Sequence, residues 1–212
     1  MAAEPATPRP AATVILLRRG GRHSTRGLEV LMLQRGAQAR FMPGIWVFAG
    51  GAVEDVDREG RFPAPNGVGA DEMAHRVCGT RELGEEASVE VEPAALLPWS
   101  RWITPEEVPM RFDTRFYVGL APPHCQPEAD LVEMDSVRWI TPATALSEHA
   151  ENRFELSFPT IKHLEELSSY PDADAVLANA ANRPVVPLTP KVIGTRESFE
   201  ILLPGDPRYE DA

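Results

Sequence analysis

The run from Arg81 to Glu86 constrains this chain more than any other stretch. In a helix, Glu82, Glu85 and Glu86 fall at i, i+3 and i+4 and share one face. Like charges at that spacing repel by about 0.2–0.5 kcal/mol per pair, and the last two also oppose the dipole at the expected helix C-terminus. A local rule broken this consistently indicates a site that binds a cation. A hard divalent metal is the cation that carboxylate oxygens bind best.

The helix that carries this run is predicted over residues 71–87 and is amphipathic. Its core face, opposite Glu82, is expected to consist of Met73, Val77, Leu83 and Ala87. His75 is expected to be exposed. Cys78 is expected nearer the carboxylate face, where a single thiol with no paired base does not make a nucleophile.

The rest of the chain is expected to consist mainly of strands, with a few helices toward its C-terminal end. Strands are expected at 12–18, 29–33, 46–48, 97–103, 116–120, 137–140 and 199–203. The first two are joined through Gly20–Gly27 as a hairpin. Further helices are expected at 142–148, 159–167 and 172–181. Strands and helices without βαβ alternation indicate an α+β domain. We expect a disordered lead at 1–10, the main domain at 11–170 and a C-terminal extension packed on it at 171–212.

Several fixed positions together resemble the Nudix box, G-x5-E-x7-REUxEExGU with U aliphatic. They are Gly51, the acid Asp57 and the run Arg81-Glu82-Leu83-x-Glu85-Glu86-x-x-Val89. The run at 41–51 resembles the strand and loop that precede the box, and the runs at 101–105 and 111–116 resemble a branch that includes coenzyme A diphosphatases. The resemblance covers about residues 10–170. It implies a Nudix-like α/β/α sandwich with a mixed sheet and a catalytic loop-helix.

The box departs from the family pattern in four places. Asp57 replaces the first glutamate, Ala49 stands where a proline often precedes the glycines, and Ser88 replaces the glycine after the Glu-Glu pair. The spacer 58–80 has 23 residues where the pattern has seven, which is an insertion of 16. Ser88 must end the helix without the ease that glycine gives to positive φ.

The resemblance implies Mg²⁺-dependent hydrolysis of a diphosphate linkage in a nucleoside diphosphate derivative, with Mn²⁺ as an alternative ion. A coenzyme A or adenine-dinucleotide-like substrate is favoured. Glu85 and Glu86 would bind metal, Glu82 would bind metal or act as base, the Gly50 carbonyl would add a ligand, and Arg81 would orient the carboxylates. A downstream carboxylate is expected from Glu133, with Asp135 second; for both, a solvated loop acid is the plain alternative.

Substrate contacts are expected from three residues: Arg40 and Arg111 on phosphate, and Phe112 on the base. Arg115 and Phe116 are alternatives of the same kind, although core packing is the favoured interpretation of both phenylalanines. Asp57 is expected to support its loop through water or an ion pair.

The composition of the chain excludes some classes of binding partner. The formal net charge of −11 argues against nucleic-acid and anionic-membrane binding, and no apolar run reaches the length of a bilayer span. Two cysteines, Cys78 and Cys125, favour a reducing, cytoplasmic setting. A homodimer stays among the expected assemblies. Two other functions stay open: a catalytically silent Nudix-fold nucleotide-binding or regulatory module, and a (d)NTP pyrophosphohydrolase.

Overall fold

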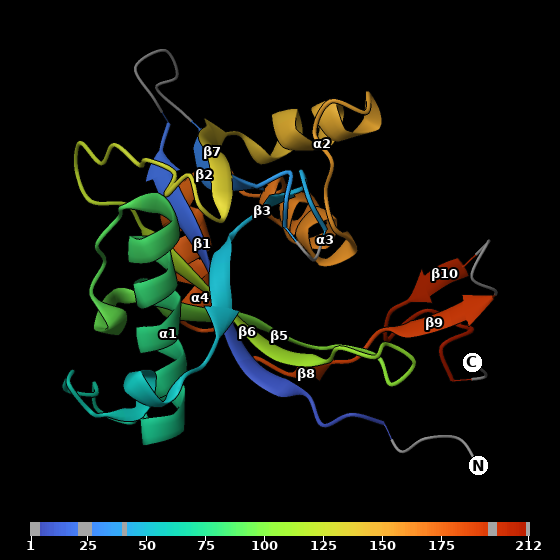
Figure 1. Cartoon of the computed structure of the whole chain (residues 1–212), viewed down its shortest axis with the longest axis horizontal. Coiled ribbons are helices and arrows are strands. Elements are labelled where there is room, and N and C mark those ends of the chain that lie inside the picture. Colours follow the sequence, from blue (N-terminus) through green and yellow to red (C-terminus); the bar gives the residue numbers. More distant parts are fainter. Residues whose placement is uncertain (1–4, 21–26, 40–41, 195–198, 211–212) are drawn as a thin grey trace.

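The computed structural model describes residues 5–20, 27–39, 42–194 and 199–210 (Figure 1). The strands are β1 (Arg9–Arg19), β2 (Leu28–Arg35), β3 (Trp46–Val47), β4 (Ala49–Ala52), β5 (Leu97–Ile103), β6 (Phe112–Leu120), β7 (Met134–Ile140), β8 (Pro187–Leu188), β9 (Lys191–Gly194) and β10 (Phe199–Leu202). The helices are α1 (Ala70–Ala87), α2 (Pro142–Ala150), α3 (Phe158–Leu167) and α4 (Ala173–Ala180), with short 3-10 turns η1 (Asp55–Arg58) and η2 (Pro93–Ala95).

The main sheet is mixed, with β1 at its centre. One end of β1 pairs antiparallel with β2, its other end pairs antiparallel with β4, and β6 runs parallel along its length. β5 pairs antiparallel with β6 and parallel with β8, while β7 and β3 pair with β2. Because β1 joins both halves, it brings the β4 glycines to the middle of the molecule.

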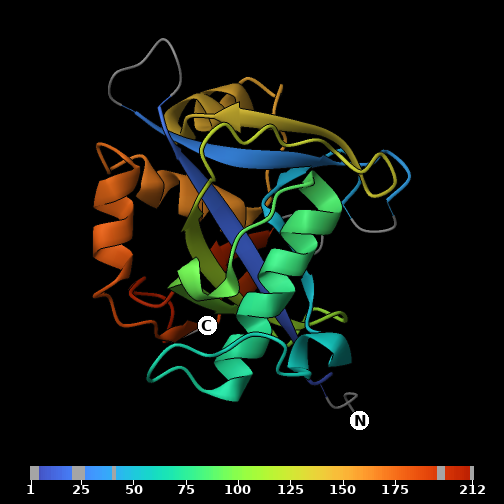
Figure 2. The ribbon, with the colours of Figure 1, turned by 90° about the vertical axis from the view of Figure 1, so that its left-hand side faces the viewer.

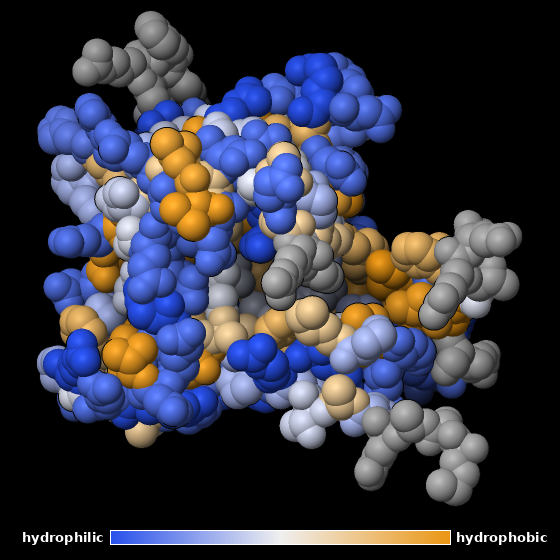
Figure 3. Space-filling model, viewed as in Figure 1, coloured by the Kyte–Doolittle hydropathy of each residue, from blue (hydrophilic) through white to orange (hydrophobic). Residues whose placement is uncertain are grey.

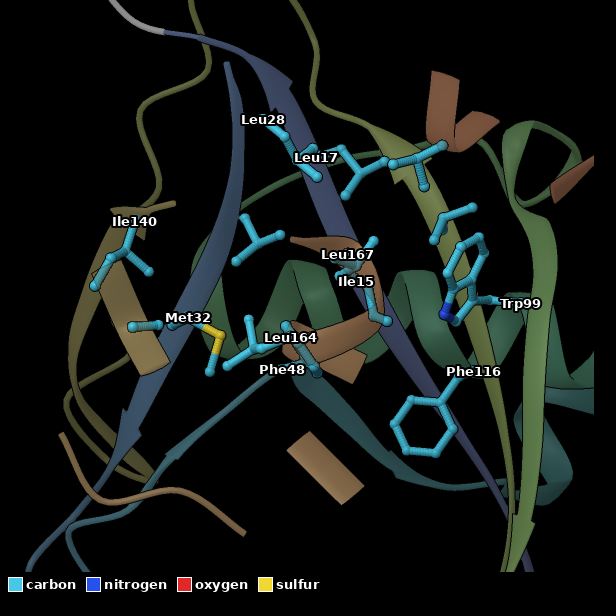
Figure 4. Close-up of a cluster of buried hydrophobic side chains, with 14 of the residues drawn as sticks. Ile15, Leu17, Leu28, Met32, Phe48, Trp99, Phe116, Ile140, Leu164 and Leu167 are labelled. Carbon is cyan, nitrogen blue, oxygen red and sulfur yellow. The ribbon is translucent and has the colours of Figure 1, made fainter. Parts of the chain in front are cut away.

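Helices cover both faces of this sheet, which confirms the predicted α+β class and its layered arrangement. α1 lies on one face, and α3 and α4 lie on the other (Figures 1 and 2). The alternating burial along β1 divides the core, so that Ile15 and Leu17 pack toward α3 and α4 and Val14 and Leu16 pack toward α1. Figure 4 shows part of the first cluster, where Leu164 and Leu167 of α3 lie over the sheet.

The predicted elements are found, with shifts at their ends. β1 begins at Arg9, so the last two residues of the expected lead are strand. The first two strands form the expected antiparallel pair, although part of the link between them lies outside the described residues. Ser88 ends α1 with φ 55° and ψ 34°, the left-handed cap that the sequence requires. The strands β4, β8 and β9 were not predicted.

Two expectations about α1, those for Val77 and His75, are wrong. Val77 is only partly buried, because Met73, Ala74, Cys78 and Leu83 make the face against the sheet. His75 is buried, and its ring nitrogen Nδ1 donates to the Asp71 carbonyl at 2.7 Å. Cys78 lies on the carboxylate side of α1 as expected, with its sulfur 3.8 Å from Arg81 Nη2, but it is fully buried there and its thiol donates to the Gly51 carbonyl at 3.5 Å. Burial raises the pKa of this thiol to about 12, so it is inert.

The C-terminal part of the chain contains a buried helix and a projecting pair of strands. Ala173 and Val176 of α4 are fully buried, so this helix is part of the core. The β9–β10 hairpin projects from the body, and Figure 3 shows apolar residues gathered over it, while the surface over α1 is largely hydrophilic. Within the described ranges, no helix is long and apolar enough to cross a membrane.

Candidate active site

The β4 glycines lie directly against the carboxylates of α1. The Gly50 N–H donates to Glu86 Oε2 at 3.0 Å. A Cβ on Gly50 would lie 2.5 Å from the Ala12 carbonyl oxygen, and one on Gly51 would collide with the Glu82 carboxylate. Glycine is therefore required here by close approach, and the approach brings the strand backbone to two of the predicted metal ligands.

Arg81 joins four partners into one network. Its Nε and Nη2 donate to the two oxygens of Asp57 at 2.9 and 3.1 Å, and Nη2 also reaches the Ala52 carbonyl at 3.3 Å. Its Nη1 lies 2.9 Å from both Glu82 and Glu85. The Asp57 side chain is 0% exposed. The inserted spacer therefore does not separate Asp57 from the helix, and the predicted ion pair of Asp57 is present.

Burial makes the carboxylate cluster costly when it is charged. Burial raises the pKa of Glu86 to about 8, an effect that the Gly50 N–H only partly offsets. Burial likewise raises the pKa of Glu82, and Arg81 opposes that shift. A bound cation would favour the charged forms of both, which is the response expected of metal ligands.

A cavity of about 510 Å³ opens beside these carboxylates. Its polar end holds Glu82, Glu86 and Glu133, next to Gly50 and Gly51. The rest of its wall is mainly apolar: Met42, Ile45, Val47, Phe48, Met110, Phe112, Phe116 and Pro159. Arg9 and Arg35 also line it. A ligand in this cavity can therefore contact carboxylates, cations and an apolar surface together.

The oxygen ligands of this site suit a hard metal ion, although the carboxylates do not converge on one point. Within the described ranges, no three Asp, Glu, His or Cys side chains form a ready cation site. The reason is visible in the ion pairs, because Arg81 draws Glu82 and Glu85 to itself. The carboxylate and carbonyl oxygens are of the type that Mg²⁺ binds, and they include the buried carboxylate of Glu86 and the half-buried one of Glu82. The donor set therefore fits the ion, and binding requires these side chains to move.

The structure separates the predicted auxiliary residues into two groups. Phe112 lines the cavity, as does Glu133, whose backbone is held by the Asp130 carboxylate and by Gly36. Asp135 instead accepts from the Ala37 N–H at 3.1 Å.

The two described arginines that the sequence suggested as phosphate ligands make other contacts. Arg111 is buried and donates to the Thr104 and Ala6 carbonyls, which is a structural role, and it does not line the cavity. Arg115 pairs with Asp71 and Glu72 of α1. Arg40 lies outside the described residues.

Sequence reasoning missed Arg9 and Arg35, which line the cavity, and the methionines Met42 and Met110 at its apolar wall. Arg35 ends β2, and its charge lowers the pKa of Glu86 against the effect of burial. A strand that ends in arginine just before the glycine-rich segment 36–51 is the signal that could have pointed to it.

Comparison with known proteins identifies the architecture. The model of the NUDIX domain matches residues 7–159. The chain is 28% identical to the putative nudix hydrolase 7 of Caenorhabditis elegans, over 96% of this chain and 75% of that protein. It is 24% identical to the human acyl-coenzyme A diphosphatase NUDT19, over 86% of this chain and 72% of that protein. A NUDIX hydrolase structure from Alicyclobacillus acidocaldarius superposes with a TM-score of 0.73 at 24% identity, covering 84% of this chain and 99% of that one.

Proposed function

The chain belongs to the Nudix family and is a pyrophosphohydrolase, and we propose that it hydrolyses the diphosphate linkage of coenzyme A or an acyl-coenzyme A in a reaction that depends on Mg²⁺ or Mn²⁺. One observation carries the proposal: the cavity that holds Glu82 and Glu86 continues into an apolar wall. A substrate with a diphosphate at its centre and a long, partly apolar arm matches both parts. The human and chicken relatives named acyl-coenzyme A diphosphatases support the same substrate class.

Glu82, Glu85, Glu86, Glu133 and the Gly50 carbonyl are the proposed metal ligands. When bound, Mg²⁺ supplies neutralisation of the phosphate oxygens and so reduces their repulsion of a nucleophile. The chain itself sets the position of the ligands. The Gly50 N–H fixes one oxygen of Glu86, and the glycine at 51 leaves room for Glu82 beside the strand.

Arg81 is proposed as a positioning residue. Its bidentate contact with the buried Asp57 fixes the guanidinium, and the remaining donors hold Glu82 and Glu85. Since the Asp57 side chain has no exposed surface, water does not compete for this contact. Glu82 serves as a metal ligand or as the base that accepts the proton of the attacking water. Attack on one phosphorus breaks the bridging P–O bond and leaves two monophosphates.

The remaining cavity residues are assigned to substrate. Arg9 and Arg35 are proposed to hold phosphate oxygens, because they are the cations of the cavity wall. Phe112 and Phe116 are proposed to contact the base. The methionine wall at Met42 and Met110 suits a flexible arm, since methionine adapts to irregular apolar surfaces.

A substrate panel in ¹⁸O water tests the proposal. The purified chain with Mg²⁺ is offered coenzyme A, an acyl-coenzyme A, ADP-ribose and dATP, and products are read by mass. We expect coenzyme A cleavage to 3′-phospho-AMP and 4′-phosphopantetheine, with one ¹⁸O in one product. Glu85→Gln and Glu86→Gln should abolish it, while Glu90→Gln, an exposed acid just after the helix, should not. An inert wild-type protein on every compound refutes the proposal.

A (d)NTP pyrophosphohydrolase is the second candidate. It would release inorganic pyrophosphate from dATP, so the same panel separates it from the first. The silent nucleotide-binding module that the sequence left open is set aside, because the family and the named relatives of this chain are hydrolases.

A further inference from the structure

Arg9 brings to the catalytic cavity a positive charge that no described acid neutralises. Its side chain lines the cavity wall and is exposed to solvent. Among the arginines and lysines that the structure describes, it is the one whose side chain makes neither an ion pair nor a hydrogen bond. Arg35, the other cation of this wall, already interacts with another group. In a protein with a net charge of −11, a free cation in this cavity indicates a place for an anionic group of the ligand.

The strand register places Arg9 away from the carboxylates beside which the diphosphate is proposed to react. In the pairing of β1 with β4, Thr13 lies opposite Gly50, and the Gly50 N–H holds Glu86. Arg9 precedes Thr13 by four residues, which is about 13 Å along an extended strand. Figure 1 shows this first part of β1 continuing beyond the end of β4. A ligand that uses both places therefore needs two separate anionic groups.

An aromatic ring lies next to Arg9 in the sheet. Arg9 and Phe112 are direct partners in the pairing of β1 with β6, and both side chains line the cavity. The described acids of the wall are Glu82, Glu86 and Glu133, and none of them stands on β1 or β6. This end of the cavity therefore offers a ring and a cation without a competing carboxylate. It suits a nucleoside whose base contacts the ring and whose ribose carries a phosphate toward the cation.

We propose that Arg9 binds a phosphate monoester on the ribose of the substrate's nucleoside, apart from the diphosphate that is hydrolysed. The inference rests on the proposed function and names one determinant of its specificity. The chain prefers coenzyme A, which carries a 3′-phosphate, to dephospho-coenzyme A, which does not. A guanidinium suits this group because it gives two parallel hydrogen bonds to phosphate oxygens. Since the side chain is exposed, the gain should be near the lower limit for a hydrogen bond to a charged group, about tenfold in affinity.

Rates on this matched pair of substrates test the proposal in the full chain with Mg²⁺. The quantity measured is the ratio of kcat/KM for coenzyme A to kcat/KM for dephospho-coenzyme A, because a general loss of activity leaves this ratio unchanged. We expect a ratio of about ten for the wild type and of about two or less for Arg9→Gln. Arg9→Lys keeps the charge but loses the paired donors, so its ratio should lie between these values.

Arg61→Gln is the control for the loss of one positive charge. Arg61 is an exposed arginine in the loop before α1, and it does not line the cavity. This variant should keep the wild-type ratio. Thermal melting establishes that each variant is folded, and Arg9→Lys replaces Arg9→Gln if the latter fails to fold.

Binding of the nucleotide product gives a second readout, which needs no turnover. In calorimetric titrations with 3′-phospho-AMP and with AMP, the wild type should bind 3′-phospho-AMP about tenfold more tightly. Arg9→Gln should bind the two nucleotides nearly equally, because the phosphate that distinguishes them has lost its cation. Arg61→Gln should keep the wild-type preference.

The possible results separate the role of Arg9 from the proposed hydrolysis. The role of Arg9 is overturned if the wild-type ratio is near one, if Arg9→Gln keeps the wild-type ratio, or if Arg9→Gln keeps the wild-type preference for 3′-phospho-AMP. Cleavage of both coenzymes at equal rates would leave the hydrolysis intact. A wild type that cleaves neither coenzyme, yet prefers 3′-phospho-AMP through Arg9, would instead overturn the hydrolysis and support the Arg9 site.

Discussion

Asp57→Asn should remove the anchor of the whole carboxylate network. The substitution keeps the size of the side chain, so one oxygen can still accept from the Glu54 N–H, which now lies 2.8 Å from Oδ2. It removes the charge that meets Arg81 at 2.9 and 3.1 Å. Breaking a buried ion pair costs about 3–5 kcal/mol. The Arg81 side chain is 20% exposed and keeps two glutamates, so we take the lower limit.

A loss of about 3 kcal/mol corresponds to a fall in melting temperature of about 6–12 °C for a chain of this size. Activity should fall about tenfold or more, because Arg81 no longer holds Glu82 and Glu85 in place. Scanning calorimetry and initial rates on the cleaved coenzyme measure the two effects. Asp55→Asn, an exposed acid two residues earlier in the same turn, is the control and should change neither. If Asp57→Asn and Asp55→Asn have the same melting temperature, the anchor role assigned to Asp57 is wrong.

Three further outcomes follow from the same structure. Gly51→Ala should lower kcat/KM about a hundredfold, since its methyl group displaces Glu82, whereas Gly69→Ala, which has open space around it and φ −74°, should be as active as the wild type; equal rates would contradict the steric argument. EDTA should abolish hydrolysis and Mg²⁺ or Mn²⁺ should restore it, while Mg²⁺ raises the melting temperature of the wild type but not of Glu86→Gln. Burial lowers the pKa of His163 to about 4 against about 6.5 in the unfolded chain, so the unfolded state binds more protons between these values, and this residue lowers the free energy of unfolding by about 2–3 kcal/mol from pH 7 to pH 4.5. Because the raised pKa of Glu86 acts in the opposite direction, urea titrations should compare the wild type with His163→Gln: over this pH range the change in the variant should be more favourable by about 2–3 kcal/mol, and equal changes in the two proteins would refute the assignment.

The helix and its carboxylates could be predicted because their signal is local. The spacing of Glu82, Glu85 and Glu86 fixes their common side of α1, and the register of β1 with β4 then brings Gly50 to that side. The sequence also indicates Phe112 and Glu133 as residues of the site, and both line the cavity. Both stand next to recognisable features, one in the resembling run at 111–116 and the other before a predicted strand.

The failures have a different physical origin, because they depend on which distant groups compete for a side chain. Arg111 and Arg115 look like phosphate ligands in the sequence. In the structure the Arg111 guanidinium donates to backbone carbonyls, and that of Arg115 pairs with two acids of α1. His75 looks like an exposed residue of a polar helix turn. It is buried because the first turns of α1 pack against β6, a contact that periodicity alone does not reveal.

The spacer also shows how an insertion can lie inside a catalytic motif without dispersing it. Only residues 59–69 are loop, since η1 ends at Arg58 and α1 begins at Ala70 and takes up the remainder of the spacer before Arg81 as helix. Two ion pairs hold the ends of that loop together. Arg58 pairs with Asp71 in the first turn of α1 at 3.5 Å, and Asp57 pairs with Arg81 further along the same helix. Closing a longer loop costs only about 0.6 kcal/mol for each doubling of its length, which is less than the ~3–5 kcal/mol lost when one partner of a buried ion pair is removed. The geometry that matters for chemistry is therefore held by Asp57 and Arg81, and the loop between them is free to differ in length.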